Sequence, residues 1–384
     1  MTIMRIAGTP LLIEDTKMLS LTILLFLSLL FSLGACQPSS QKAIEHPITT
    51  NYSSFQFITT VNELQLRTTP NIKAKVIDSL ANNLILIGLG ETSKEVSNIR
   101  LRGISYKEPW QKVKTASGKT GWVFGGGLNI ATPDKNSVAQ NNFLQTRLSG
   151  VFGESIAREI QQYRMAYQRI RSCTNLANAY RQGIIIRDSI VQVLHNTAEV
   201  VDPVEPANLD WLEQAMPGFK TQLVAESTKF HLFVDYQQFN KKSALTPEKE
   251  DDIFIDLNLQ IYTADSTEHF YPSWFIQTWD YGGHSLLGTG THFKVLQHID
   301  ELKTTTSLFN PELSTIKSSL LNDLTAEWVT YWESQKAIQK ELTQIVKSNL
   351  SCLSSDEKLL LQQRLIAFDN PELNNISLNN KAKE

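Results

Sequence analysis

Chemically capable side chains gather in one stretch of the chain, Tyr271–Phe293. It is rich in aromatic residues and glycines, and it holds two of the seven histidines. The candidate site residues within it are Trp279, Asp280, His284, Ser285 and His292. Serine, histidine and aspartate are the residue types of nucleophilic, acid–base and metal-assisted catalysis, so this stretch is the first place to look for an enzyme.

Ser285 would serve as a nucleophile if its surroundings formed the G-x-S-x-G turn. The run from Gly283 to Gly288 comes close to that pattern. The pattern needs a glycine two residues after the serine, because the strained turn brings a strand and a helix too close for a side chain. Leu287 stands at that place, and no alternating strand–helix pattern surrounds it. The sequence therefore argues against a serine hydrolase.

Asp280, His284, His292 and His298 would form a metal site of imidazole and carboxylate ligands, which suit zinc or iron. Their spacing is poor for this role. On one helix, positions 284 and 292 could share a face, but 298 could not, and the glycines argue against a continuous helix. We therefore predict no bound metal and no cofactor.

The glycines of this stretch allow two further interpretations. Gly282-Gly283 and Gly288-Thr289-Gly290 could expose backbone N–H groups to a ligand at the start of a helix over 292–302. Alternatively, they permit a tight interhelical loop with buried aromatic residues around it. No phosphate-binding fingerprint frames the loop, so we favour the packing interpretation.

The elements around this stretch follow a helical period over residues 141–373. From Leu148 to Ile170, apolar residues recur at steps of three and four. A second helix follows a break at Gly183. Further helices are expected at 208–216, 219–240, 247–263, 321–345 and 359–366. We therefore predict an all-α domain, with apolar stripes that form its core, preceded by a polar linker (132–140) and followed by a polar tail (374–384).

Residues 55–131 have a different character, because short β-rich runs alternate there with turn residues. Ser117-Gly118-Lys119-Thr120 between two such runs indicates a hairpin. Five or six strands in so short a segment predict a small β-barrel. The expected strands are 55–61, 64–67, 75–79, 84–89, 110–115 and 121–124.

Four motifs in this segment resemble those of bacterial SH3 domains. They are the strand and turn Leu64-Gln65-Leu66-Arg67-Thr68-Thr69-Pro70, the second strand 75–80, the fourth strand 110–115 and the closing run Gly118-Lys119-Thr120-Gly121-Trp122-Val123. Two features depart from the family pattern. Residues 91–108 are longer than the usual loop, and Gly125-Gly126-Gly127-Leu128 lacks the aromatic residue often found before the final leucine.

The resemblance implies a binding groove lined by aromatic residues. Tryptophan can fill a core or line a groove with its N–H facing outward. We expect Trp122 to be mainly structural, Trp110 to be a groove candidate, Tyr106 to be an exposed candidate and Arg67 to bond turn carbonyl groups. The expected ligand-binding residues are Tyr106, Trp110, Trp122 and Phe124.

The N-terminal residues indicate where in the cell the protein is located. A short apolar run over 19–33 ends in Leu33-Gly34-Ala35-Cys36, which resembles a bacterial lipoprotein signal. The resemblance implies cleavage of residues 1–35 and acylation of Cys36, with 36–54 as a flexible tether. Gln37, where Asp would favour inner-membrane retention, implies the outer membrane. No acidic run follows Cys36 to suggest export to the cell surface, so we favour the periplasmic face. The alternative is an uncleaved membrane anchor, and Met18 is an alternative start.

Composition narrows the function classes. The hydrophobic content is 41%, the charged content 20% and the net charge -3, as in an ordinary globular protein. Such a charge supplies no basic field for nucleic acid. Cys173 and Cys352 would form a disulfide in an oxidising periplasm or stay as buried thiols.

We therefore expect an α+β multidomain protein, with a small SH3-like β-barrel followed by a larger all-α helical domain. Its expected function is binding of a cell-wall peptide of peptidoglycan or of an envelope protein, with the helical domain as scaffold or ligand-binding body. The alternatives are an envelope enzyme, a hydrolase or metal-dependent, that uses the stretch from Trp279 to His292, and an assembly factor that recruits another envelope protein.

Overall fold

The computed structural model describes residues 55–134, 136–198, 206–224, 229–263, 271–278, 282–305, 307–327 and 329–379. The predicted signal, Cys36 and the tether lie outside the described residues. Residues Thr49–Glu384 belong to one compact unit. The boundaries predicted inside that unit remain predictions.

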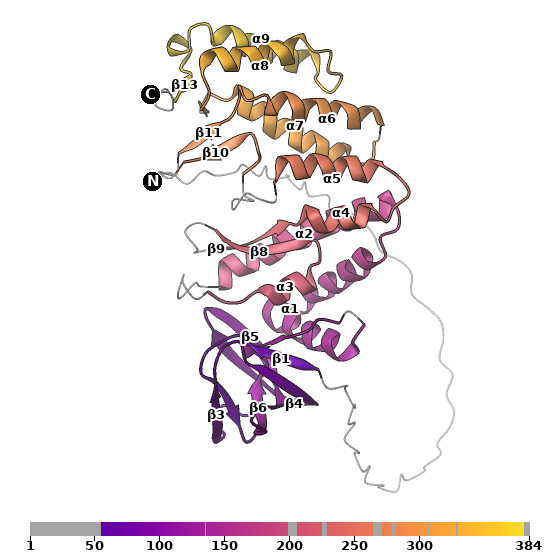
Figure 1. Ribbon diagram of the computed structural model, residues 1–384, viewed down its shortest axis with the longest axis vertical. Coiled ribbons are helices and arrows are strands. Elements are labelled where there is room, and N and C mark those ends of the chain that lie inside the picture. Colours follow the sequence, from indigo (N-terminus) through magenta and orange to yellow (C-terminus); the bar gives the residue numbers. More distant parts are fainter. Residues whose placement is uncertain are drawn as a thin grey trace, which may run out of the picture. The chain divides into compact units, whose positions relative to one another are not determined.

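Antiparallel strands form the N-terminal part of the described chain (Figure 1). The sheet has seven strands in the order β3-β2-β6-β5-β4-β1-β7. No pairing in the described part joins β3 to β7, so a closed barrel is not seen. The strands are β1 (Gln56–Thr59), β2 (Leu64–Arg67), β3 (Val76–Leu80), β4 (Ile85–Leu101), β5 (Ile104–Lys114), β6 (Thr120–Phe124) and β7 (Leu128–Ile130).

The six expected strands are present, and the expected loop over 91–108 is not a loop. β4 and β5 continue through it as a long hairpin, which turns at Arg102-Gly103. Both turn residues have positive φ, +45° and +86°, which suits glycine at the second position. The predicted hairpin between β5 and β6 is confirmed, with Gly118 at φ +87°.

Helices follow the sheet and pack on one another in succession: α1 on α2, α2 on α5, α5 on α6, α6 on α7 and α8, and α8 on α9 (Figure 1). α1 also packs against β5 of the sheet. The helices are α1 (Val138–Gln168), α2 (Cys173–Thr197), α3 (Asp210–Ala215), α4 (Tyr236–Ser243), α5 (Glu250–Ile261), α6 (Thr291–Thr305), α7 (Asn310–Thr325), α8 (Gln335–Lys347) and α9 (Ser355–Ala367).

α1 and α2 both begin earlier than the apolar period suggested. α1 starts within the expected linker, where the Ser137 hydroxyl accepts the Gln140 N–H. α2 runs through Gly183 without a break. A Cβ at Gly183 would lie 2.6 Å from the Phe219 ring. This glycine therefore serves close packing inside the helix, and the predicted break is wrong.

The expectation of an all-α region is also wrong, because strands interrupt it. The predicted helix 219–240 is the hairpin of β8 (Phe219–Val224) and β9 (Lys229–Val234), followed by α4. The predicted helix 321–345 is interrupted after α7 by β12 (Thr330–Tyr331). β12 pairs on one side with β11 (Gly283–Ser285) and on the other with β13 (Ser377–Leu378), which lies in the predicted tail. β11 also pairs with β10 (Phe275–Gln277).

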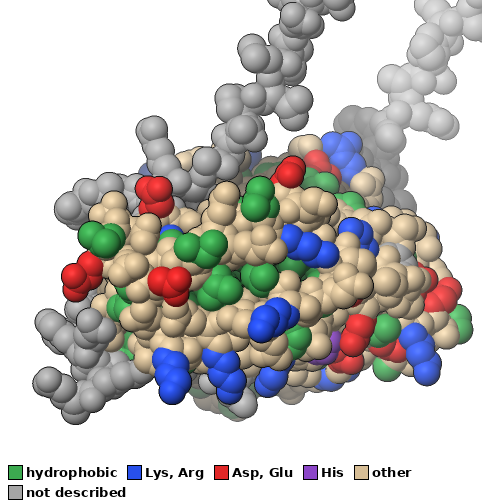
Figure 2. All heavy atoms as spheres, turned by 90° about the horizontal axis from the view of Figure 1, so that it is seen from above, with side chains coloured by type: hydrophobic (Ala, Val, Ile, Leu, Met, Phe, Trp, Pro, Cys, Tyr) green, Lys and Arg blue, Asp and Glu red, His purple; other side chains and the backbone are tan. Residues whose placement is uncertain are grey.

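The apolar stripe of α9 is only partly core. Leu361 is buried, whereas Leu359, Leu360 and Ile366 are exposed. Figure 2 shows this end of the protein, with apolar side chains near the middle of the face and charged side chains around them. The expectation that the helical stripes form core, not surface, is therefore wrong for α9.

Cys173 and Cys352 are free and buried. Burial raises the pKa of each thiol to about 12. Both thiols are therefore protonated at neutral pH, and they behave as small core residues. Among the described helices, none is both long and apolar enough for a membrane span.

Candidate functional site

The sheet carries a row of aromatic and cationic side chains on one face of β5 and β6. Trp110 lies opposite Phe124, and Lys112 lies opposite Trp122. Because side chains alternate along a strand, these four share a face. Val123, between Trp122 and Phe124, and Val113, next to Lys112, point to the other face and are fully buried in the core of the sheet.

One end of this row is buried. Trp110, Phe124 and the nearby Tyr106 are exposed by only 2%, 3% and 4%. The Trp110 indole N–H donates to the Ser97 hydroxyl at 2.9 Å. Burial raises the pKa of Tyr106 to about 12. Tyr106 is therefore not exposed, contrary to expectation, and all three rings belong to the core shared with the helices.

Arg147 of α1 anchors the helices to this end. Its guanidinium bonds Glu108 of β5 at 2.8 Å, and both side chains are only 1% exposed. It also donates to the side-chain oxygen of Asn129 and to the backbone carbonyls of Gly125 and Leu128 at 2.6–2.8 Å. A buried charge needs such partners, because water no longer solvates it.

The glycine run after β6 is explained by the same contacts. A Cβ at Gly125 would lie 2.7 Å from a carboxylate oxygen of Glu108, and one at Gly126 would meet the Tyr106 ring at about the same distance. Larger residues here would displace the carboxylate that Arg147 binds. The glycine run thus allows close packing against residues of the sheet.

The other end of the row is open. Trp122 is half-buried, and the Lys112 ammonium lies 5.8 Å from its ring centroid. Lys114 is exposed and faces the exposed Ile87 across β4 and β5. We call Ile87, Leu89, Lys112, Lys114 and Trp122 the open strip. The burial of the two tryptophans is the reverse of what we expected: Trp110 fills the core, and Trp122 reaches the surface.

Arg67 behaves as expected from the sequence. Its guanidinium donates to the Ala74 carbonyl in the turn after β2 at 2.6 Å, and it also bonds the Gln65 side chain. The prediction that Arg67 satisfies turn carbonyl groups is confirmed.

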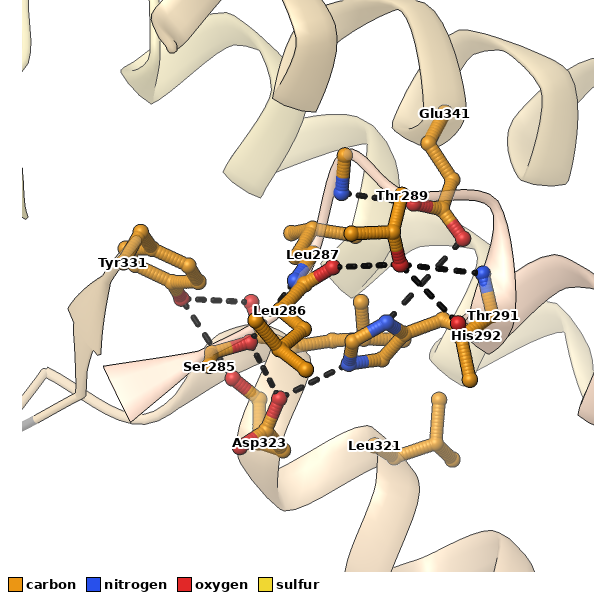
Figure 3. A network of polar contacts seen from close by, with 12 residues as sticks. Ser285, Leu286, Leu287, Thr289, Thr291, His292, Leu321, Asp323, Tyr331 and Glu341 are labelled. Atoms are coloured by element: carbon orange, nitrogen blue, oxygen red, sulfur yellow. Dashed lines mark hydrogen bonds and ion pairs between the residues drawn. The ribbon is translucent and has the colours of Figure 1, made fainter. Parts of the chain in front are cut away.

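The second candidate stretch forms a buried polar network (Figure 3). Trp279 and Asp280 lie outside the described residues. One oxygen of Asp323 in α7 accepts from the Ser285 hydroxyl at 2.5 Å and from the His292 ring at 2.8 Å. Ser285 and His292 have no exposed surface. His284 lies instead beside the Trp332 ring.

This geometry does not assemble a serine nucleophile. A catalytic serine needs a base at its hydroxyl, with a third group orienting that base. In this network, the carboxylate stands between Ser285 and His292, so the imidazole does not take the serine proton. No described group of three or more His, Cys, Asp or Glu side chains is placed to hold a metal ion.

Glu341 of α8 occupies the place where the glycine loop would bind an anion. It is 2% exposed and accepts the backbone N–H groups of Gly288, Gly290 and Phe293 at 2.6–3.0 Å. Figure 3 shows this carboxylate beside the loop. The N–H groups of Gly288 and Gly290, just before α6, are thus used within the protein, so this part of the loop does not offer them to a ligand.

Sequence reasoning missed Arg147, Glu108, Asp323 and Glu341. Arg147 carried one usable signal, because it lies three residues after Leu144 and four before Val151 on the apolar side of α1. A charged residue at such a position requires a partner. The acidic residues carried no local signal, since their partners are distant in sequence.

Comparison with known proteins identifies one part of the chain. Residues 62–129 match the family described as bacterial SH3 domain. No curated protein and no solved structure matches the chain. The matched residues include the five strands β2 to β6 and the open strip, and a bacterial SH3 domain is a type of module suited to cell-wall or protein binding.

Proposed function

We propose that this is a lipid-anchored protein of the bacterial envelope whose SH3 domain binds a cell-wall peptide or a partner protein through the open strip. The observation that carries the proposal is the half-exposed Trp122, in a row whose other aromatic rings, Trp110 and Phe124, are buried. The SH3 match over 62–129 supports a binding role.

The chemistry of the open strip suits a peptide. A partly exposed indole offers a large, rigid surface for an apolar side chain, and such residues dominate binding energies at interfaces. Lys112 and Lys114 complement carboxylate groups on the ligand. Lys112 is also paired with Glu91 at 2.7 Å, and this exposed pair is weak enough to exchange for a ligand.

Removing the Trp122 ring is the direct test. We expect Trp122→Ala to weaken retention on purified peptidoglycan, or on the crosslinked partner protein, by about 2 kcal/mol, roughly thirtyfold in Kd. Trp332→Ala is the matched control, because Trp332 is also half-buried but lies beside His284 in the helical region. Equal binding by Trp122→Ala and the unchanged chain would contradict the proposal.

Membrane attachment depends on Cys36. We expect Cys36→Ser to abolish incorporation of a palmitate analogue and to release the protein from the membrane fraction, because one sulfur atom carries the proposed anchor. The lipoprotein-like run Leu33-Gly34-Ala35-Cys36 supports this. Metabolic labelling in cells measures it, with Cys173→Ser as the control. Label that persists in Cys36→Ser would refute the anchor.

A further inference from the structure

A large cavity lies in the helical region and takes no part in the proposed SH3 function. It has a volume of about 880 Å³ and is bounded by α2, β8, β9, α4, α5 and α7. Small-molecule sites in proteins have volumes of this order. No residue singled out from the sequence contributes to it.

The cavity wall offers an extensive apolar surface. Tyr236 of α4 and Tyr262, just after α5, stack with ring centroids 5.8 Å apart and planes 9° from parallel. Phe254, Leu259 and Ile316 contribute further apolar surface. The body of a ligand in this space would therefore be apolar.

A buried pair of tyrosine hydroxyls on the wall has unused hydrogen-bonding capacity, and a buried asparagine lies on the same wall. The hydroxyls of Tyr180 and Tyr236 lie 3.2 Å apart, so one donates to the other and one hydrogen remains available. Asn258 is only 2% exposed and donates its amide to the Phe254 carbonyl at 2.8 Å. Buried polar groups of this kind normally have partners.

The charges on the wall favour an anion. The acidic groups are already satisfied: Arg181 binds Glu312 at 2.6 Å, and Asp235 accepts from the Gln238 amide at 3.0 Å and lies 3.5 Å from the Lys220 ammonium.

Arg187 differs from Arg181 and Lys220, because it pairs with no acidic side chain among the described residues of the cavity wall. Its hydrogen bonds within the described chain go to the adjacent Asp188, whose side chain is 64% exposed. Burial raises the pKa of Tyr180, Tyr236 and Tyr262. The positive charge of Arg187 partly opposes that rise, so the guanidinium interacts electrostatically with these three hydroxyls. A water-exposed bond to a neighbouring residue holds it only weakly.

We infer that this cavity binds an amphiphilic anion, with its apolar body along the stacked tyrosines and its carboxylate at Arg187 and the tyrosine hydroxyls. Arg187 supplies the planar donor pair that matches a carboxylate. The unused tyrosine hydrogen adds a second donor.

Three probes with the same ten-carbon tail test the inference: decanoate, 1-decanol and decyltrimethylammonium. Calorimetry uses the full chain carrying Cys36→Ser, in which no acyl chain at Cys36 competes. We expect one decanoate per chain and binding of the other two probes weaker by about tenfold or more. Arg187→Gln should remove that preference, whereas Arg158→Gln, at an exposed position of α1, should retain it.

Absence of decanoate binding, or equal affinity for all three probes, would overturn the inference. Equal decanoate affinity in Arg187→Gln would do the same, since the head group would then lie elsewhere. Loss of peptidoglycan binding in Trp122→Ala is independent of these outcomes, so failure here and failure of the SH3 proposal are distinguishable.

Discussion

Replacing Arg147 by methionine is expected to lower the free energy of unfolding by about 3–5 kcal/mol, the cost of leaving one member of a buried ion pair alone. Methionine retains the apolar stem of the side chain but removes the charge. The Glu108 carboxylate, 1% exposed, then has no cation, and the Gly125 and Leu128 carbonyls lose a donor. Chemical denaturation of the full chain measures the change.

Two controls separate the charge from the packing. Arg158→Met changes an exposed arginine of the same helix and should cost less than about 0.5 kcal/mol. The double variant Arg147→Met/Glu108→Leu should recover most of the loss, because a buried pair replaced by apolar residues is often neutral. A single Arg147→Met variant as stable as the unchanged chain would refute the role of Arg147.

Glu341→Ala is also expected to have a large effect, lowering the free energy of unfolding by about 3 kcal/mol or more. It removes the acceptor of three backbone N–H groups at the start of α6, and each buried donor without a partner costs about 1–3 kcal/mol. The helix dipole adds to the loss, because a carboxylate at a helix N-terminus is favourable.

Glu341→Gln should lose less, because one side-chain oxygen still accepts. Gln344→Ala, at an exposed position of the same helix, is the matched control and should be nearly neutral. Unfolding curves of the three variants test the order. Equal stability of Glu341→Ala and Gln344→Ala would show that the carboxylate does not hold the loop.

Much of the sheet was predictable because its signals are local. The alternation in β2 and β6 and the glycine turn before β6 can be read within a few residues. The hairpin in the region 219–240 was not predictable, because the apolar residues there also fit a helical period. Phe230 and Leu232 are buried on alternate positions of β9, and Gly218 at φ +90° precedes β8. The N-cap Ser334 was a readable sign that a new helix begins there.

The site was less predictable because burial depends on distant segments. Trp110 and Trp122 both lie on strands of the sheet, and which of them is buried depends on the core shared with the helices, where Trp110 is 2% exposed and Trp122 is only partly buried. Glu108 is 39 residues from Arg147. The sequence pointed to the backbone N–H groups of Gly288 and Gly290 as possible donors to a ligand, but Glu341, 51 residues beyond Gly290, accepts both of them.

The central claim is that the described helices cover one end of the aromatic row and leave the Trp122 end for ligands. Hydrogen exchange of the full chain, with and without soluble peptidoglycan fragments or the purified partner, tests it most directly. The account predicts that binding slows exchange over residues 112–122, around Trp122, and leaves 104–110 unchanged. Protection confined to residues 104–110, or protection only in the helical region, would contradict it.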